Sequence, residues 1–327
     1  MIVHFHPGTA FITKHHNAWR WFLLFGFALL AVFACPGAGQ AQVTPAAERT
    51  RDSAEARATF RGQIMGQQDT GEPITFDVAG STLHGRFFRA ADAGLRPTLM
   101  LFHGYPGGKG DVMGIAQAVA KAGWNTLVFR PRGWHDSEGT FSLENSLIDV
   151  RSALHYLQAS ASQLNVDTAR LAAAGYSFGG WLALMSGIQH AELKCVATLA
   201  PATVSAQLRA DPGFRTVFEQ ILDEPIRNGQ IRGTSGSAII KEILADSLRL
   251  DPGGRAAELA KKPVLVIGGW RDTGVSIEGW IASLVRALRR AGNQQVTPVT
   301  VDDDHTFRQT RPEIQLAIAK WLTTSCN

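Results

Sequence analysis

The chain has 327 residues, of which 45% are hydrophobic and 18% charged, and this composition is typical of a globular protein with one large or two small domains. The formal net charge is +4, but the basic residues are scattered, and the densest cluster (Arg286, Arg289 and Arg290) has the spacing of a solvated helix face. Nucleic-acid binding is not expected, because it requires a basic stripe with interleaved aromatic residues.

Residues 1–41 have the pattern of a secretory signal peptide. Lys14 and Arg20 precede the uncharged apolar segment 21–34, and small residues follow it up to Ala41. The apolar segment is shorter than the ~20 residues that a spanning helix needs, which favours free export over a retained membrane anchor. A second alternative stays open, because residues 32–35 (VFAC) resemble a lipoprotein cleavage box that would leave Cys35 lipidated and the protein tethered.

Two cysteines, Cys195 and Cys326, remain after the expected cleavage. Export permits a disulfide between them, but Cys195 lies in an apolar segment, and burial in the core is the simpler account of it. The sequence has neither a CxxC pair nor an HExxH helix. We therefore expect no metal site and no cofactor.

Residues 42–71 are polar and rich in alanine and are expected to form a linker, whereas residues 72–327 have the pattern of a single α/β domain. Alternating apolar and polar residues around Ala79–Gly80 predict a β-hairpin over 74–90. Continuous apolar segments predict buried strands at 97–104, 124–131, 169–177, 195–202, 263–270 and 294–301. Helical spacing predicts helices at 114–123, 142–159, 179–189, 277–292 and 311–322.

This alternation of strands and helices predicts a mostly parallel central sheet flanked by helices on both faces. Residues 202–260 interrupt it, because they carry helical patterns and no strand pattern. We expect this insertion to form a small helical cap over one edge of the sheet. In α/β enzymes that edge is where ligands bind.

Ser177 lies between Gly175 and Gly179 in the segment GYSFG, at the junction of a predicted strand and a predicted helix. A serine at such a junction must turn the chain sharply, and the two glycines avoid a clash with the crowded neighbouring main chain. The first N–H groups of the helix also point toward the turn. The pentapeptide alone is a weak signal, but its position is typical of a serine nucleophile.

A serine hydroxyl needs a base that takes its proton, and His305 is the histidine best placed for this role. It follows the last predicted strand, where a base would lie over the carboxyl edge of the sheet. Asp272 follows strand 263–270 and is the expected partner that orients the imidazole. The alternatives for that partner are Asp302, Asp303 and Asp304, which also fit a solvated turn. The other histidines of the domain are expected to brace a loop (His103), lie at the rim (His135), or occupy edge and helix positions (His84, His155 and His190).

Hydrolysis through a serine also requires two hydrogen-bond donors for the developing oxyanion. We expect these donors to be the main-chain N–H groups of Phe178, directly after the serine, and of Tyr105 in the segment HGYPGG. Trp134 and His135, in the segment RGWHDSEG, are expected to line the substrate entrance.

Five segments in this order, LFHGYPGG, RPRGWHDSEGTF, GYSFGG, GGWRDTGVS and DDDHTF, resemble the successive signature segments of the α/β-hydrolase superfamily. The similarity is closest to its esterase and prolyl-oligopeptidase-like branches and covers about residues 72–325. The resemblance implies an α/β-hydrolase fold and the same five site residues: Ser177 as nucleophile, Asp272 as acid, His305 as base, and Tyr105 and Phe178 as oxyanion donors. The chain departs from the pattern at Tyr176, where many relatives have histidine, and at residues 302–304, where glycine is common.

These observations favour an exported serine hydrolase that cleaves carboxylic esters of small substrates. A serine peptidase is the first alternative. It would need a carboxylate near the cap for the amino terminus of its substrate, and Glu219, Asp223 and Glu224 either supply one or form a solvated helix face. A non-catalytic binding protein on the same fold is the second alternative, because a fold does not fix a function.

Overall fold

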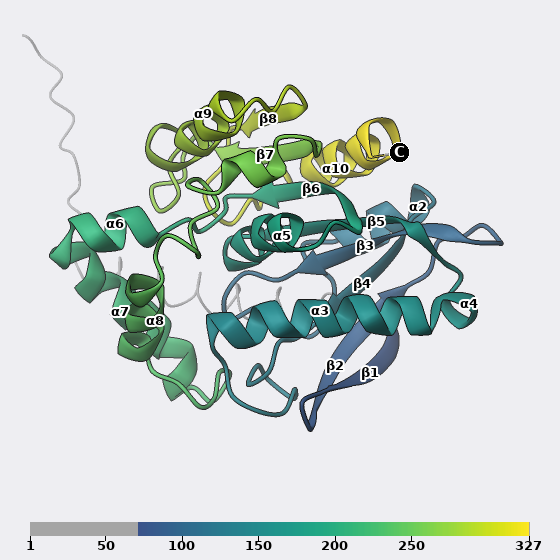
Figure 1. The fold of residues 1–327 in the computed structure, drawn as a ribbon, viewed down its shortest axis with the longest axis horizontal. Helices are drawn as coiled ribbons and strands as arrows, with labels where there is room; N and C mark the ends of the chain where they lie inside the picture. The colour runs from purple at the N-terminus through teal and green to yellow at the C-terminus, as the bar shows by residue number, and fades with distance from the viewer. Residues whose placement is uncertain (1–70, 327) are drawn as a thin grey trace, which may run out of the picture. The chain divides into compact units, whose positions relative to one another are not determined.

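A computed structural model describes residues 71–326, and the expected signal peptide, Cys35 and nearly all of the expected linker lie outside the described residues. The described part contains one eight-stranded sheet with the strand order β1-β2-β4-β3-β5-β6-β7-β8. β2 pairs antiparallel with both of its neighbours, and the remaining pairs are parallel. The predicted mostly parallel sheet is therefore confirmed (Figure 1).

The predicted hairpin consists of β1 (Glu72–Val78) and β2 (Ser81–Phe88), joined at Ala79 and Gly80, which both have positive φ. The central strands are largely apolar, and helices bury most of their residues on both faces, whereas residues 167–170 are partly or fully exposed. They are β3 (Arg96–Phe102), β4 (Asn125–Phe129), β5 (Val166–Tyr176), β6 (Leu193–Leu199) and β7 (Val264–Gly269). The strand β8 (Val296–Val301) forms the second edge of the sheet and is half-exposed.

Helices cover both faces of this sheet. α3 (Leu143–Ala159) and α5 (Phe178–Gln189) pack together on one face, and α2 (Ile115–Lys121) packs against α10 (Arg311–Ser325) on the other (Figure 1). α9 (Ala282–Arg290) packs on β8, and the short α4 (Ala161–Leu164) leads into β5. The remaining short turns are η1 (Ala256–Leu259) and the π-helical turn η2 (Ile277–Ile281).

The insertion between β6 and β7 is helical, as the sequence predicts, and lies at one end of the sheet (Figure 1). It contains α6 (Ser205–Ala210), α7 (Pro212–Arg227) and α8 (Gly236–Ala245). An antiparallel bridge between Trp134 and Ile231 joins this cap to the loop after β4. The Glu242 carboxylate of α8 also accepts hydrogen bonds from the first N–H groups of α3, at 2.9 and 2.8 Å. The cap is thus joined to the sheet domain by main-chain and side-chain hydrogen bonds.

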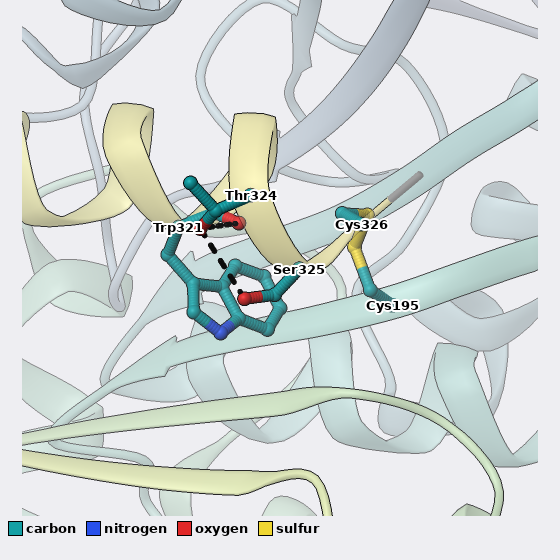
Figure 2. Close-up of a disulfide and its surroundings, with 5 residues drawn as sticks. All are labelled: Cys195, Trp321, Thr324, Ser325 and Cys326. Carbon is teal, nitrogen blue, oxygen red and sulfur yellow. Dashed lines mark hydrogen bonds between the residues drawn. A yellow bond between two sulfur atoms is a disulfide. The ribbon is translucent and has the colours of Figure 1, made fainter.

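Cys195 combines the two alternatives that its sequence left open, burial in the core and a disulfide. Cys195 is fully buried in β6, as expected, but it forms a disulfide with Cys326 at the end of α10 (Figure 2). The Cα atoms of the two residues lie 5.6 Å apart although 131 positions separate them in the sequence. Packing of α10 brings the two cysteines together, and the local sequence pattern contains no signal of that packing.

Among residues 71–326, no helix is both long enough and apolar enough to cross a membrane.

Candidate active site

Ser177 forms the turn between β5 and α5, with a φ of 54° and a ψ of −115°. This conformation is sparsely populated for residues other than glycine and persists only where the surroundings enforce it. The Ser177 N–H donates to the Leu199 carbonyl at 2.8 Å, and the Ser177 carbonyl accepts from the Ala202 N–H at 3.0 Å. Leu199 is the last residue of β6 and Ala202 lies in the loop after it, so the carboxyl end of β6 and this loop hold the strained turn in place.

The glycines on either side of Ser177 are required by the packing of the main chain around the turn. A Cβ on Gly175 would lie 2.0 Å from the Gly179 carbonyl oxygen, and a Cβ on Gly179 would lie 2.3 Å from the Phe102 carbonyl oxygen. These distances leave no room for a side chain at either position. The close approach of α5 to β3 and β5 thus explains the GxSxG spacing.

Asp272 lies just after β7, where its buried carboxylate is held by its own loop. One oxygen accepts hydrogen bonds from the N–H groups of Gly274 and Val275 at 2.9 and 2.7 Å. The second oxygen lies 2.7 Å from Nδ1 of His305. Burial alone would raise the pKa of Asp272, but the hydrogen bonds from His305, Val275 and Gly274 outweigh it and bring the pKa below its usual value. Asp272 is therefore ionised at neutral pH.

His305 completes a hydrogen-bonded chain from Asp272 to Ser177. Its Nε2 lies 3.1 Å from Oγ of Ser177, and its ring is about one-third exposed. An ionised carboxylate only accepts hydrogen bonds, so Nδ1 carries the proton toward Asp272, and Nε2 is left to accept from the serine hydroxyl. This assignment of the tautomer follows from the hydrogen-bond network. The imidazole is thus arranged as a base directed at Ser177.

The three aspartates before His305 have other roles than that of its partner. The buried Asp303 carboxylate accepts hydrogen bonds from the N–H groups of Gln309 and Thr310, and Asp304 accepts one from Thr306. Both carboxylates therefore stabilise the conformation of their own loop. Asp302 is exposed and forms a 3.0 Å ion pair with Arg271. The sequence offered no signal for these roles, because they depend on how the loop closes on itself.

The two expected oxyanion donors lie at the ends of neighbouring strands. Phe178 is the first residue of α5, and Tyr105 follows β3, which pairs with β5. Neither main-chain N–H donates a hydrogen bond within the described part of the chain. The Tyr105 hydroxyl is already engaged, because it donates to the Leu222 carbonyl of α7 at 2.8 Å. Burial, with a further contribution from the Asp223 charge, raises the pKa of Tyr105, so this hydroxyl stays a donor at neutral pH.

The expectation that Trp134 lines the substrate entrance is wrong. Its side chain is only 1% exposed and packs against Tyr105 and Phe178, with ring centroids 5.8 and 5.5 Å apart. His135 is partly exposed, but its Nε2 lies 3.1 Å from the Pro106 carbonyl, and its own carbonyl accepts from Arg232. Both residues therefore support the loop that carries Tyr105. The sequence did not reveal this for Trp134, because an aromatic side chain after a strand can turn inward as readily as outward.

His103 braces the same loop, as its position predicts. Its Nε2 donates to the Gly110 carbonyl at 2.9 Å, and burial lowers the pKa of its imidazole to about 4. The ring therefore stays neutral at physiological pH. His84 belongs to β2, His155 to α3, and His190 to the C-terminal end of α5.

A cavity of about 200 Å³ lies between α6 and η2. Thr203, Gln207 and Trp280 are among its lining residues. Its lining residue Thr203 directly follows Ala202, whose N–H donates to the Ser177 carbonyl at 3.0 Å. On α7, Phe214 stacks on Phe218 at 5.5 Å and approaches Trp280 edge-on at 6.4 Å. These aromatic residues were not singled out from the sequence, because their assembly depends on the placement of the cap.

Within the residues that the structure describes, no group of three or more His, Cys, Asp or Glu side chains is arranged to hold a metal ion.

The chain is similar in sequence to known proteins over about a third of its length. The BD-FAE family model matches residues 110–210. Two curated relatives, both the uncharacterized protein YfhR, from Salmonella typhi and Salmonella typhimurium, are 34% identical over 115 residues. This match spans 33% of the chain and 38% of the length of each relative.

Solved structures match over a larger share of the chain. Est1E from Butyrivibrio proteoclasticus is 19% identical, with a TM-score of 0.61 over 78% of this chain and 99% of its own. An esterase from Pyrobaculum calidifontis is 19% identical, with a TM-score of 0.60 over 88% of this chain and 97% of its own. The acylaminoacyl peptidase of Pyrococcus horikoshii is 16% identical, with a TM-score of 0.57 over 81% of this chain and 44% of its own. The chain therefore has the α/β-hydrolase fold.

Proposed function

We propose that this protein is a serine hydrolase that cleaves carboxylic esters of small substrates through an acyl-enzyme. The observation that carries the proposal is the continuous hydrogen-bonded chain from Asp272 through His305 to Ser177, on a strained turn at the carboxyl edge of an α/β-hydrolase sheet. Arranged in this way, a base activates the serine, and a carboxylate holds the base in the correct tautomer.

The proposed reaction starts when Oγ of Ser177 attacks the ester carbonyl carbon while Nε2 of His305 takes the hydroxyl proton. The carbonyl oxygen becomes an oxyanion, for which the N–H groups of Phe178 and Tyr105 are the proposed donors. The C–O bond to the alcohol then breaks as His305 returns the proton to the leaving oxygen. A water molecule, deprotonated by His305, hydrolyses the acyl-enzyme and regenerates the Ser177 hydroxyl. These steps require no cofactor.

The cavity between α6 and η2 is the proposed site for the apolar part of the ester, because its lining residue Thr203 follows Ala202, which is hydrogen-bonded to Ser177. Its volume of about 200 Å³ is sufficient for one substituted aromatic ring, given that an apolar cavity of roughly 150 Å³ binds benzene. Trp280 lines this cavity, and Phe214 of α7 packs edge-on against Trp280. A solved structure of Est1E contains bound ferulic acid, and an ester with an aromatic acyl group is accordingly the first substrate to test.

Peptidase activity has less support from the cap. A peptidase of the type considered needs a free carboxylate for the amino terminus of its substrate, but Asp223 accepts a 2.7 Å hydrogen bond from the first N–H of α8. Its negative charge is therefore committed to the start of that helix. Glu224 is exposed on α7, as expected for a solvated helix face, and Glu219 of the same helix is half-buried.

Export is also part of the proposal. It rests on the signal-peptide pattern of residues 1–41 and is supported by the disulfide between Cys195 and Cys326, since such bonds persist mainly in oxidising compartments. N-terminal sequencing of the protein recovered from each cell fraction tests it. Cleavage near Ala41 supports free export, whereas a chain that begins at a lipidated Cys35 supports a tethered form.

The catalytic proposal is tested with a fluorophosphonate probe and with Ser177→Ala. The wild-type protein and the matched surface control Ser237→Ala should be labelled by the probe. Both should also hydrolyse nitrophenyl acetate and an ester with an aromatic acyl group. Ser177→Ala should be neither labelled nor active. Equal labelling of Ser177→Ala would exclude Ser177 as the nucleophile. Turnover of aminoacyl anilides without turnover of esters would instead favour the peptidase.

A further inference from the structure

Tyr176, the residue directly before Ser177, connects the nucleophile turn to the loop of His305. Its hydroxyl donates a 2.8 Å hydrogen bond to the main-chain carbonyl of His305. Its ring lies beside the imidazole, with centroids 5.1 Å apart and planes inclined by 42°. The ring also meets Phe307 edge-on, with centroids 6.2 Å apart. One side chain therefore contacts both the main chain and the ring of the proposed base.

The same ring is packed against the loop that carries Tyr105. A Cβ on Gly104 would lie 2.8 Å from two ring carbons of Tyr176, so the ring occupies the space that a side chain at Gly104 would need. Tyr176 thus lies between the segments of the proposed oxyanion donors, the nucleophile and the base. Displacement of the ring would loosen contacts with all three segments.

The Tyr176 hydroxyl is a dependable donor. Its burial raises its pKa above the usual value, and the charges of Asp272 and Asp304 act in the same direction. The hydroxyl therefore keeps its proton over the working range of the enzyme. The carboxylates of Asp303 and Asp304 accept hydrogen bonds from the residues adjacent to His305 in the loop. The Tyr176 hydroxyl, in contrast, donates to His305 itself.

We propose that Tyr176 is a positioning residue that fixes the imidazole of His305 between Asp272 and Ser177. The inference rests on the proposed serine-hydrolase function. Tyr176 does not touch the reacting atoms but acts through His305, whose Nε2 must stay within hydrogen-bonding distance of Ser177 Oγ. Because the 3.1 Å contact is already at the long end of such distances, a small displacement of the ring breaks it.

Tyr176→Phe removes the hydroxyl and keeps the ring. We expect the rate of acylation by a nitrophenyl ester to fall by about tenfold to a hundredfold with little change in KM, because a misplacement of roughly 1 Å costs about a hundredfold. Tyr156→Phe is the matched control, since Tyr156 lies on α3 with its ring stacked on Phe76. Its rate should equal that of the wild type.

Two further measurements distinguish a positioning role of Tyr176 from a merely structural one. In Tyr176→Phe, the low-field proton resonance of His305 Nδ1–H should weaken or shift, and the acidic limb of the pH–rate profile should move, because the contact with Asp272 is loosened. Rates are expressed per folded molecule, from circular dichroism and probe titration.

Tyr176→His is a second variant. Its acylation rate is expected to fall by a similar factor, because the shorter side chain does not reach the His305 carbonyl.

A Tyr176→Phe enzyme with the wild-type rate, pH profile and resonance would overturn the inference, as would an equal loss in Tyr156→Phe. Failure of the proposed function itself would be recognised separately, because the wild-type protein would then react with neither probe nor ester.

Discussion

Asp272 shows how one residue combines several local contacts to serve a neighbour. Its carboxylate takes two main-chain hydrogen bonds on one oxygen and faces the His305 imidazole with the other. The main-chain contacts fix the direction of the carboxylate, and the net lowering of its pKa keeps it charged. A group with a lowered pKa in the folded state stabilises that state above its unfolded pKa, and this contribution is lost as the pH falls through the folded pKa.

We expect Asp272→Asn to lower kcat by about four orders of magnitude, because an amide in place of the carboxylate favours the wrong imidazole tautomer. KM should change little, since the substrate does not contact this side chain in the proposed mechanism. Steady-state kinetics on a nitrophenyl ester measure both constants. Asp302→Asn is the matched control and should stay within about twofold of the wild type. A large loss in Asp302→Asn together with an active Asp272→Asn would reverse the two assignments.

At the scale of single elements, α2 depends on a buried carboxylate at its start. Asp111 accepts hydrogen bonds from the N–H groups of Ala116 and Gln117 at 2.7 and 3.0 Å. Desolvation of its carboxyl outweighs these hydrogen bonds and raises its pKa to about 6. The folded state therefore binds this proton more tightly than the unfolded state does.

It follows that Asp111 contributes stability that is fully present below its unfolded pKa, near 4, and is lost as the pH rises through about 6. Asp111→Asn removes this dependence. We expect the free energy of unfolding of the wild type, relative to Asp111→Asn, to decrease by at most about 3 kcal/mol between pH 4 and pH 7. Urea unfolding across this range measures the difference. A difference that is constant, or that grows with pH, would contradict the raised pKa.

At the scale of the whole molecule, the disulfide joins the centre of the sheet to the end of the chain's last helix (Figure 2). α10 follows directly on the loop of His305, so the bond fixes the far end of the segment that carries the proposed base. It closes a loop of more than a hundred residues, for which the chain-entropy model assigns a large stabilisation.

Cys326→Ala is expected to reduce the free energy of unfolding by about 2–5 kcal/mol. Thermal and urea unfolding measure the loss, and addition of a reducing agent should bring the wild type close to the variant without altering the variant. Ser325→Ala, at the neighbouring position, is the matched control and should unfold like the wild type. Two free thiols at these positions in the untreated wild type, detected by mass spectrometry, would contradict the bond.

The fold and the candidate triad could be predicted from the sequence because both depend on local pattern and chain order. Ser177, Asp272 and His305 each follow a strand with an apolar pattern, and the carboxyl ends of parallel strands meet at one edge of the sheet. Trp134 was misplaced because pattern does not distinguish an aromatic side chain that turns inward from one that lines an entrance. The contact of Tyr176 with His305 spans 129 positions and depends on tertiary packing, as does the pairing of Cys195 with Cys326.

The outer strand β8 has a consequence for self-association. Pro298, opposite Val266 in the middle of β8, has no main-chain N–H, and proline in a sheet is tolerated where that missing donor faces away from the neighbouring strand. A second molecule that docked its own strand along β8 would therefore meet a gap in the row of donors at the centre of a six-residue edge. This side of the sheet is therefore protected against growth into a continuous intermolecular sheet.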